Sequence, residues 1–123
     1  MGALKVMLVD DEQEFATTLA ERLRMRGMDT VTAFDGEDAL KMISVQKPHV
    51  IVLDIMMPGM SGLQVLSRIM EISPGTPVIL LTGIGSTTEG IAGMKNGAVD
   101  YLMKPLQIEE LIEKIRAAVK KDA

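Results

Sequence analysis

The feature that most constrains this chain is a short apolar run that ends at an acid. Residues 50–53 are VIVL, Asp54 follows, and the chain continues as IMMPGMSG to residue 62. Four apolar, mostly β-branched residues bounded by Pro and Gly predict a fully buried strand with a loop behind it. In an open α/β sheet, ligands lie beyond the carboxyl ends of the strands. Asp54 is therefore the first candidate functional residue, although an acid here can also simply end a strand.

The composition predicts one domain, residues 1–123, with an ordinary hydrophobic core. The absence of Cys excludes disulfides and thiolate metal sites. The apolar runs are too short for a membrane span, and the N-terminus lacks the apolar region of a signal peptide. A net charge of -4 opposes direct nucleic-acid binding, which needs clustered Lys and Arg. We therefore expect a cytoplasmic protein without direct contact to a membrane or a nucleic acid.

Five apolar runs alternate with five amphipathic segments along the chain. Strands are predicted at residues 5–9, 29–33, 50–53, 77–81 and 100–103. Helices are predicted from just past residue 11 to about 26, at 36–46, 62–72 and 86–96, and past residue 105. This alternation implies a parallel sheet that is covered on both faces, with right-handed crossovers.

The polarity of the runs predicts the order of the strands. The first, third and fourth runs are apolar throughout, whereas the second and fifth are more polar. Strands buried on both faces are continuous hydrophobic runs, so the first, third and fourth belong in the middle of the sheet. The order 2-1-3-4-5 satisfies this condition. The expected fold class is α/β, a (βα)5 three-layer sandwich around a five-stranded parallel sheet.

Polar residues follow four of the five strands at one edge of this sheet. They are Asp10 and Asp11 after the first strand, Asp54 after the third, Thr82 after the fourth and Lys104 after the fifth. Three carboxylates in one crevice repel one another, so each is costly to keep charged in a partly buried site. Lys104 supplies one positive charge, and a hard divalent cation would supply the rest.

The ligand chemistry of these residues points to one kind of reaction. Carboxylate oxygens and water suit Mg²⁺ or Mn²⁺ rather than zinc, which prefers nitrogen and sulfur ligands. Mg²⁺ also shares its coordination shell with phosphate oxygens. A carboxylate nucleophile, a divalent cation, a hydroxyl and a lysine together describe a site that accepts a phosphoryl group.

Four motifs carry a family resemblance: VDD at residues 9–11, LDIMMPGMSG at 53–62, LTG at 81–83 and DYLMKP at 100–105. Together they resemble the receiver domain of two-component response regulators, over essentially the whole chain. The resemblance implies a flavodoxin-like fold and a phosphoacceptor that is not an enzyme beyond weak self-catalysed phosphoryl transfer and dephosphorylation. It implies a sensor histidine kinase or phosphotransfer protein as donor, a downstream effector domain or protein, and room for a phosphorylation-dependent homodimer.

The resemblance also implies roles for the acids. Asp54 matches the aspartate that accepts the phosphoryl group from a kinase phosphohistidine. Asp11 matches a direct Mg²⁺ ligand, together with Asp54 and the backbone carbonyl of Met56. Asp10 matches an acid that acts mostly through water. Each assignment places one motif residue in one role.

The remaining motif residues match the parts of a switch. Thr82 matches the hydroxyl that bonds the new phosphoryl oxygen, and Lys104 matches the ammonium that pairs with it. Tyr101 matches an aromatic side chain whose rotamer tracks activation, on an output face made by the fourth helix, fifth strand and fifth helix. The Lys104–Pro105 bond matches a peptide that is usually cis in the family. Leu106 departs from many relatives, which carry Phe, and is expected to alter packing rather than chemistry.

Each of these residues also has a purely structural interpretation. Asp11 with Glu14 can cap the first helix. Thr82 can end a strand, Pro105 can be a first-turn helix proline, and Tyr101 can fill the core. Together with the strand-ending interpretation of Asp54, they require five coincidences at one edge of one sheet, so the sequence favours the functional interpretation.

Three rival functions follow from parts of the sequence. A haloacid-dehalogenase-like phosphatase needs a second acid two residues after its nucleophile, where this chain has Met56. A nucleotide-binding loop at residues 83–88, GIGSTT, lacks a third glycine and follows the fourth strand. A receiver-like docking module that is never phosphorylated remains the main alternative. His49, at the opposite edge of the sheet, is expected to be structural.

The segment after the fourth strand is rich in glycine. Its members are Gly83, Gly85, Gly90, Gly93 and Gly97. An interior Gly weakens a helix by about 1 kcal/mol relative to Ala. We therefore expect residues 83–97 to be the most mobile part of the unphosphorylated domain.

Overall fold

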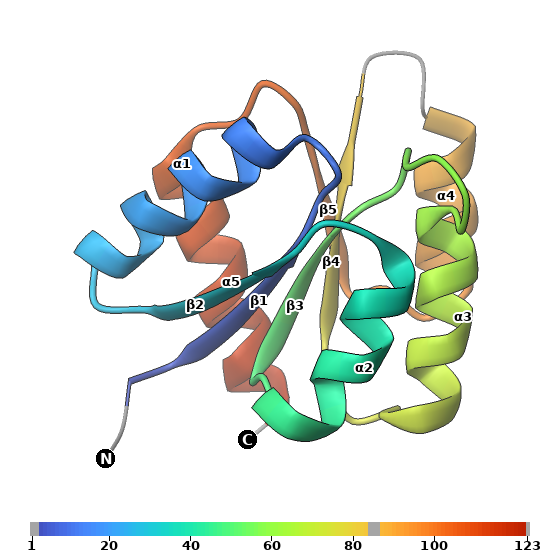
Figure 1. Cartoon of the computed structure of the whole chain (residues 1–123), viewed down its shortest axis with the longest axis horizontal. Coiled ribbons are helices and arrows are strands. Elements are labelled where there is room, and N and C mark those ends of the chain that lie inside the picture. The colour runs from blue at the N-terminus through green and yellow to red at the C-terminus, as the bar shows by residue number, and fades with distance from the viewer. Residues whose placement is uncertain (1–2, 84–86, 123) are drawn as a thin grey trace.

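Strands and helices alternate along the whole described chain (Figure 1). The structure is a computed structural model and describes residues 3–83 and 87–122. The elements are β1 (Lys5–Val9), α1 (Gln13–Met25), β2 (Asp29–Ala33), α2 (Gly36–Gln46), β3 (Val50–Asp54), α3 (Gly62–Ile72), β4 (Val78–Thr82), α4 (Thr87–Lys95), β5 (Asp100–Met103) and α5 (Ile108–Asp122). All the predicted elements are confirmed, and β3 and β4 extend to include Asp54 and Thr82. Ser86, the predicted start of α4, lies outside the described residues.

The five strands form one parallel sheet in the order β2-β1-β3-β4-β5, which confirms the predicted topology. Every residue of β3 and β4 is buried, whereas the edge strands β2 and β5 each have exposed positions. The polarity of each run thus correctly predicted whether its strand is central or at an edge, because only central strands are shielded from water on both faces.

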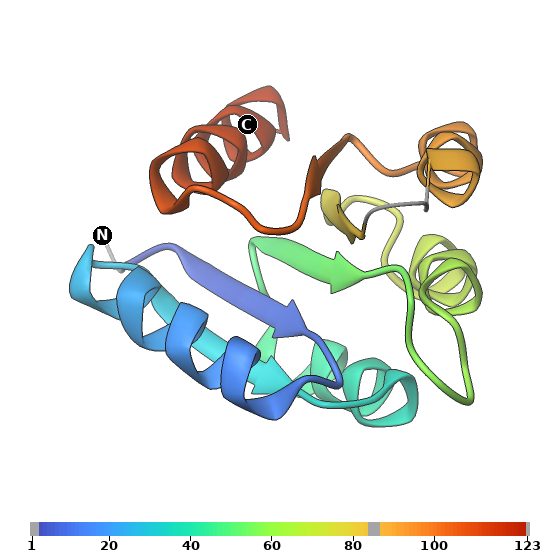
Figure 2. The ribbon, with the colours of Figure 1, turned by 90° about the horizontal axis from the view of Figure 1, so that it is seen from above.

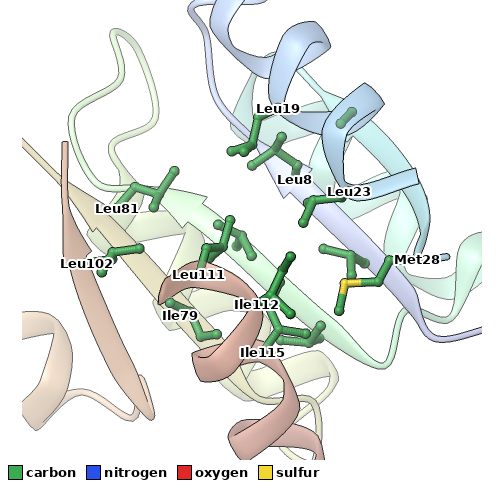
Figure 3. Close-up of a cluster of buried hydrophobic side chains, with 14 of the residues drawn as sticks. Leu8, Leu19, Leu23, Met28, Ile79, Leu81, Leu102, Leu111, Ile112 and Ile115 are labelled. Carbon is green, nitrogen blue, oxygen red and sulfur yellow. The ribbon is translucent and has the colours of Figure 1, made fainter. Parts of the chain in front are cut away.

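Successive side chains of the central strands point to opposite faces of the sheet, so they belong to two separate hydrophobic cores. Figures 1 and 2 show α1 and α5 on one side of the sheet and α2, α3 and α4 on the other. Leu8 faces the first pair of helices and its neighbour Met7 faces the other three. Figure 3 shows the first core, where α1, α5 and the sheet meet through Leu8, Leu19, Leu23, Met28, Ile79, Leu81, Leu102, Leu111, Ile112 and Ile115. Within residues 3–83 and 87–122, no helix has the length and apolar character that a membrane crossing requires.

Helix α3 begins in direct contact with the end of β3. Ser61 caps it in a capping box, in which the Ser61 hydroxyl accepts from the Gln64 amide and the Gln64 side chain accepts from the Ser61 amide. The next residue, Gly62, has no room for a side chain, because an added Cβ would overlap Ile55 Cα and lie 2.5 Å from the Asp54 carbonyl oxygen. The glycine therefore lets α3 approach the strand that carries Asp54.

We expect Gly62→Ala to lower the free energy of unfolding by about 2 kcal/mol, because the new methyl group would meet backbone that cannot move aside. Gly75→Ala is the matched control, since a Cβ at Gly75 would meet open space, and its effect should stay within about 0.5 kcal/mol. Urea denaturation of both variants measures the difference. Equal midpoints for the two variants would contradict the close approach of α3 to β3.

Candidate functional site

Four polar residues meet at one edge of the sheet because the strands are parallel and in register. Asp54 is the last residue of β3 and pairs with Leu81 of β4. Thr82 ends β4 and pairs with Met103 of β5, after which Lys104 follows. Asp10 follows β1, and its amide continues the sheet by donating to the Ala33 carbonyl. The carboxyl ends of β1, β3, β4 and β5 thus bring these side chains to a single crevice.

The ammonium group of Lys104 lies at the centre of this crevice. Its Nζ atom is 2.7 Å from Glu12 Oε1, 2.8 Å from Asp10 Oδ2 and 3.6 Å from Asp54 Oδ2. The face of the Phe15 ring also contacts the ammonium, with 4.5 Å between Nζ and the ring centroid. One cation therefore serves three carboxylates, so the group as a whole carries an excess of negative charge.

Asp10 and Asp54 are held by the same local geometry. The Oδ1 atom of Asp10 accepts from the amide of Glu12 at 2.9 Å, and Oδ1 of Asp54 accepts from the amide of Met56 at 3.1 Å. In each case the donor is two residues further along the chain, as in an Asx-turn. The second oxygen of each aspartate is then directed at Lys104. Both carboxylates are buried and their orientation is fixed by the backbone.

Burial and repulsion change the proton affinity of the site. Burial is the main cause that raises the pKa of Asp54 from 3.8 to about 7, and the charge of Asp10 raises it further, against the opposing effects of Lys104 and the Met56 amide. Burial alone would lower the pKa of Lys104, but its contacts with Asp10, Glu12 and Asp54 outweigh burial and raise that pKa above its ordinary value. The single lysine therefore leaves the repulsion between the two aspartates uncompensated.

Three carboxylates are close enough to share one metal ion. One oxygen each from Asp10, Glu12 and Asp54 lies within 4.8 Å of the others. Oxygen ligands of this kind suit a hard divalent cation. Asp11, which the sequence nominated as a ligand, is half-buried beside this group and is not among the three. Met56, nominated through its carbonyl, is joined to the site through its amide.

Thr82 and Tyr101 lie together at a small cavity beside the acids. Thr82 is buried, and its carbonyl accepts from the amide of Lys104 at 2.7 Å. Tyr101 is 46% exposed, which contradicts its interpretation as core filler. A cavity of about 60 Å³ lies among the end of β4, β5 and α4, and its lining includes Thr82, Gly90 and Tyr101. The hydroxyl and the aromatic ring therefore border the same empty space.

Several other expectations are resolved by the structure. The Lys104–Pro105 peptide bond is cis, as the resemblance implies. Leu106 packs against the core formed with α1 and α5, in agreement with a packing role. His49 accepts a hydrogen bond from the amide of Lys5 at 2.9 Å, in agreement with a structural role. The proposed Asp11 cap is wrong, because Glu12 is the N-cap residue of α1 and its side chain makes no capping hydrogen bond.

Sequence reasoning missed Glu12 and Phe15, the other two neighbours of Lys104. Glu12 is the third acid of the run Asp10-Asp11-Glu12, and that run was the only available signal. Its contact with Lys104 joins residues that are 92 positions apart in the chain. The order of the strands does not reveal such a pair, because the contact also depends on where α1 begins.

The raised pKa of Asp54 predicts a loss of stability with rising pH in metal-free protein. Between about pH 4 and pH 7 the folded protein keeps the Asp54 proton that the unfolded chain releases, so the folded state binds more protons and its stability falls as the pH rises. Asp54→Asn should abolish this dependence and be more stable by about 2 to 4 kcal/mol above pH 7. Denaturant titrations with a chelator test this. A stability difference between the two proteins that is constant over this range would contradict the raised pKa of Asp54.

Comparison with known proteins gives the family. The family model described as "Response regulator receiver domain" matches residues 6–116. The probable transcriptional regulatory protein TcrX of Mycobacterium tuberculosis is 41% identical over 116 residues, which are 94% of this chain and 50% of that protein. The DNA-binding response regulator MtrA of Mycolicibacterium paratuberculosis is 35% identical over 118 residues, which are 96% of this chain and 52% of that protein. The chain thus spans about half the length of these curated relatives.

Solved structures agree with this assignment. The receiver domain of the Francisella response regulator 1452 has a TM-score of 0.88 and 38% identity, and the match covers 98% of this chain and 99% of that chain. NtrX from Brucella abortus has a TM-score of 0.93 and 31% identity over 98% of this chain and 28% of that chain. The chain therefore belongs to the receiver domain family of two-component response regulators.

Proposed function

We propose that Asp54 accepts a phosphoryl group, in a Mg²⁺-dependent reaction, from the phosphohistidine of a sensor kinase or phosphotransfer protein. The observation that supports this most directly is the placement of Lys104, whose Nζ lies 3.6 Å from the buried Asp54 carboxylate within a group of three acids. An ammonium at this position can neutralise the charge of a phosphoryl group that arrives at the carboxylate.

The hydrogen bonds of Asp54 favour one of its two oxygens as the attacking atom. The Met56 amide occupies Oδ1 of Asp54, so Oδ2, on the side of Lys104, is the free nucleophile. This oxygen attacks phosphorus as the bond to the donor histidine nitrogen breaks, and the electron pair of that bond stays on the imidazole nitrogen, which takes up a proton. No general base is required, because a carboxylate attacks in its deprotonated form. Lys104 stabilises the charge of the transferring group.

The residues present fit a Mg²⁺ or Mn²⁺ ion. The donor set is made of oxygen, and Asp54 shows the uncompensated repulsion by Asp10 that a cation would relieve. Asp10 and Asp54, two of the three acids that are close enough to share an ion, would hold it together with Asp11 and the carbonyl of Met56, the two ligands that the family resemblance adds. The ion would supply positive charge that keeps Asp54 ionised and polarises the phosphoryl oxygens.

The output switch would use Thr82 and Tyr101. A phosphoryl group on Asp54 brings acceptor oxygens that the Thr82 hydroxyl can bond. Movement of Thr82 toward the acids would enlarge the adjacent cavity, into which the half-exposed ring of Tyr101 can turn. The face formed by α4, β5 and α5 would then differ between the two states and be read by a partner.

The wider setting is part of the same proposal. Residues 1–123 would form a single cytoplasmic receiver domain that hydrolyses its own phosphoryl group weakly and is not otherwise an enzyme. The signal would pass to an effector domain or a separate protein, or to a phosphorylation-dependent homodimer. The names of the two mycobacterial relatives favour a transcriptional output reached through another domain. The alternative, a docking module that is never phosphorylated, makes the opposite prediction in the following experiment.

Incubation with Mg²⁺ and acetyl phosphate should add one phosphoryl group to the wild-type protein. Asp54→Asn should lower the yield at least about 100-fold, because an amide is not a nucleophile of this kind. Asp38→Asn, which removes an exposed acid from the first turn of α2, should react like the wild type. Intact mass measures the adduct. An adduct on both the wild type and Asp54→Asn, or on neither, would contradict the assignment of Asp54.

Amide exchange in unphosphorylated α4 should be about 10- to 30-fold faster than in α3, because two interior glycines weaken α4 by about 2 kcal/mol. The two helices are of similar length, and α3 has the capping box. Gly90→Ala should slow exchange in α4 alone, since its Cβ would meet Thr82 Cγ2 at a tolerable 3.4 Å. Mass spectrometry of deuterated peptides measures both helices. Equal protection of α3 and α4 would refute the weakness of α4.

A further inference from the structure

We propose that Glu12 is a positioning residue that competes with the phosphoryl group for Lys104. This inference rests on the proposed phosphorylation of Asp54. In the unphosphorylated protein the Glu12 carboxylate holds the ammonium at 2.7 Å, whereas Asp54 lies at 3.6 Å. Lys104 is thus drawn toward Glu12 and away from the group that reacts. Phosphorylation then requires that Glu12 gives up this contact.

Glu12 is the member of the acidic group that is free to leave. Asp10 is fully buried, and one of its oxygens is fixed by the Glu12 amide. The side chain of Glu12 is 64% exposed, so its carboxylate can turn into water without losing solvation. A buried charge that loses its partner is strongly penalised, whereas an exposed one is not. Glu12 is therefore the residue that leaves Lys104, and Asp10 stays paired with it.

The Glu12 carboxylate lies close to the place that a phosphoryl group on Asp54 would occupy. The Glu12 oxygen lies within 4.8 Å of the Asp54 oxygen. A phosphoryl group on Asp54 would extend into this interval and place its doubly negative oxygens beside the Glu12 carboxylate. Both anions would seek the same ammonium. The two anions repel each other, and the phosphoryl group carries the larger negative charge. The phosphoryl group therefore replaces Glu12 as the partner of Lys104.

The ammonium stays in the crevice when Glu12 departs. Asp10 remains at 2.8 Å, and the Phe15 ring continues to face the charge at 4.5 Å from its centroid. A cation over an aromatic face is stabilised without a hydrogen bond, so the ring does not compete for the donors of Lys104. Removal of the Glu12 charge should therefore release Lys104 toward Asp54 and favour the phosphorylated state.

Glu12→Gln is the central test, and Glu14→Gln is its matched control. Both variants remove one negative charge from an exposed side chain at the start of α1. In the part of the chain that the structure describes, the carboxylates within ion-pair distance of Lys104 are those of Asp10, Glu12 and Asp54, so Glu14 is outside the group. The bond from the Glu12 amide to Asp10 uses the main chain and survives the substitution.

At saturating Mg²⁺, Glu12→Gln should raise the initial rate of phosphorylation by acetyl phosphate about two- to fivefold, the factor expected for one exposed ion pair. Its affinity for beryllofluoride, a non-covalent phosphoryl analogue, should rise by a similar factor. Glu14→Gln should change both quantities by less than about 1.5-fold. At high ionic strength the gain of Glu12→Gln should shrink, because salt also weakens an exposed ion pair, but it should stay larger than the gain of Glu14→Gln. Glu12→Asp keeps the charge but withdraws it from Lys104, so it should behave like Glu12→Gln.

Three results would overturn the role of Glu12. They are equal effects of Glu12→Gln and Glu14→Gln, a rate for Glu12→Gln at or below the wild-type rate, and a rate for Glu12→Asp that equals the wild-type rate. Each of them leaves phosphorylation of the wild-type protein at Asp54 intact. By contrast, no adduct on the wild type, or an undiminished adduct on Asp54→Asn, would refute the proposed function itself. The two failures are therefore distinguishable in one set of measurements.

Discussion

The rest of the site depends on one electrostatic imbalance, a single ammonium shared by three carboxylates. Lys104 is within 2.8 Å of Asp10 and Glu12, and 3.6 Å from Asp54. In water the repulsion between these carboxylates would be weak. Asp10 and Asp54 are buried, however, and like charges repel one another more strongly in the protein interior. Burial is the main cause that raises the pKa of Asp54, and the charge of Asp10 raises it further. A site with this deficit of positive charge favours binding of a cation and tolerates added negative charge only after one is bound.

The sheet holds this imbalance in place. Successive residues of β3 face opposite cores, as Val52 and Leu53 do, so a shift of the strand by one residue would exchange every buried side chain between the two faces. The register of β3 therefore keeps the backbone of Asp54 at the edge of the sheet where Asp10 also lies. Gly62 adds a second restraint, because it lets α3 contact the backbone at the end of β3. The repulsion within the site is therefore balanced by packing on both faces of the sheet.

The sequence predicted those features that depend on local pattern and topology. Apolar runs located the strands, their polarity gave the order 2-1-3-4-5, and the strand ends identified Asp10, Asp54 and Lys104 as neighbours. It did not predict Glu12 at Lys104, because that contact depends on where α1 begins and spans 92 residues. From the sequence, Gly93 was interpreted only as a residue that destabilises the helix. The structure shows that it also allows close packing, because an added Cβ there would overlap Leu80. Contacts between distant elements decide both cases, and no local pattern encodes them.

Gly93 and Gly90 make α4 both closely packed and weak. Without a side chain at Gly93 the helix lies directly on Leu80, and a Cβ at Gly90 would be only 3.4 Å from the methyl group of Thr82. The same two residues lower the intrinsic stability of the helix, since interior glycines disfavour helical conformation. The position of α4 thus rests on contacts with β4 rather than on its own hydrogen-bonded turns. If phosphorylation of Asp54 draws Thr82 toward the acids, α4 would lose one of these contacts, and this loss would favour a new position of the helix.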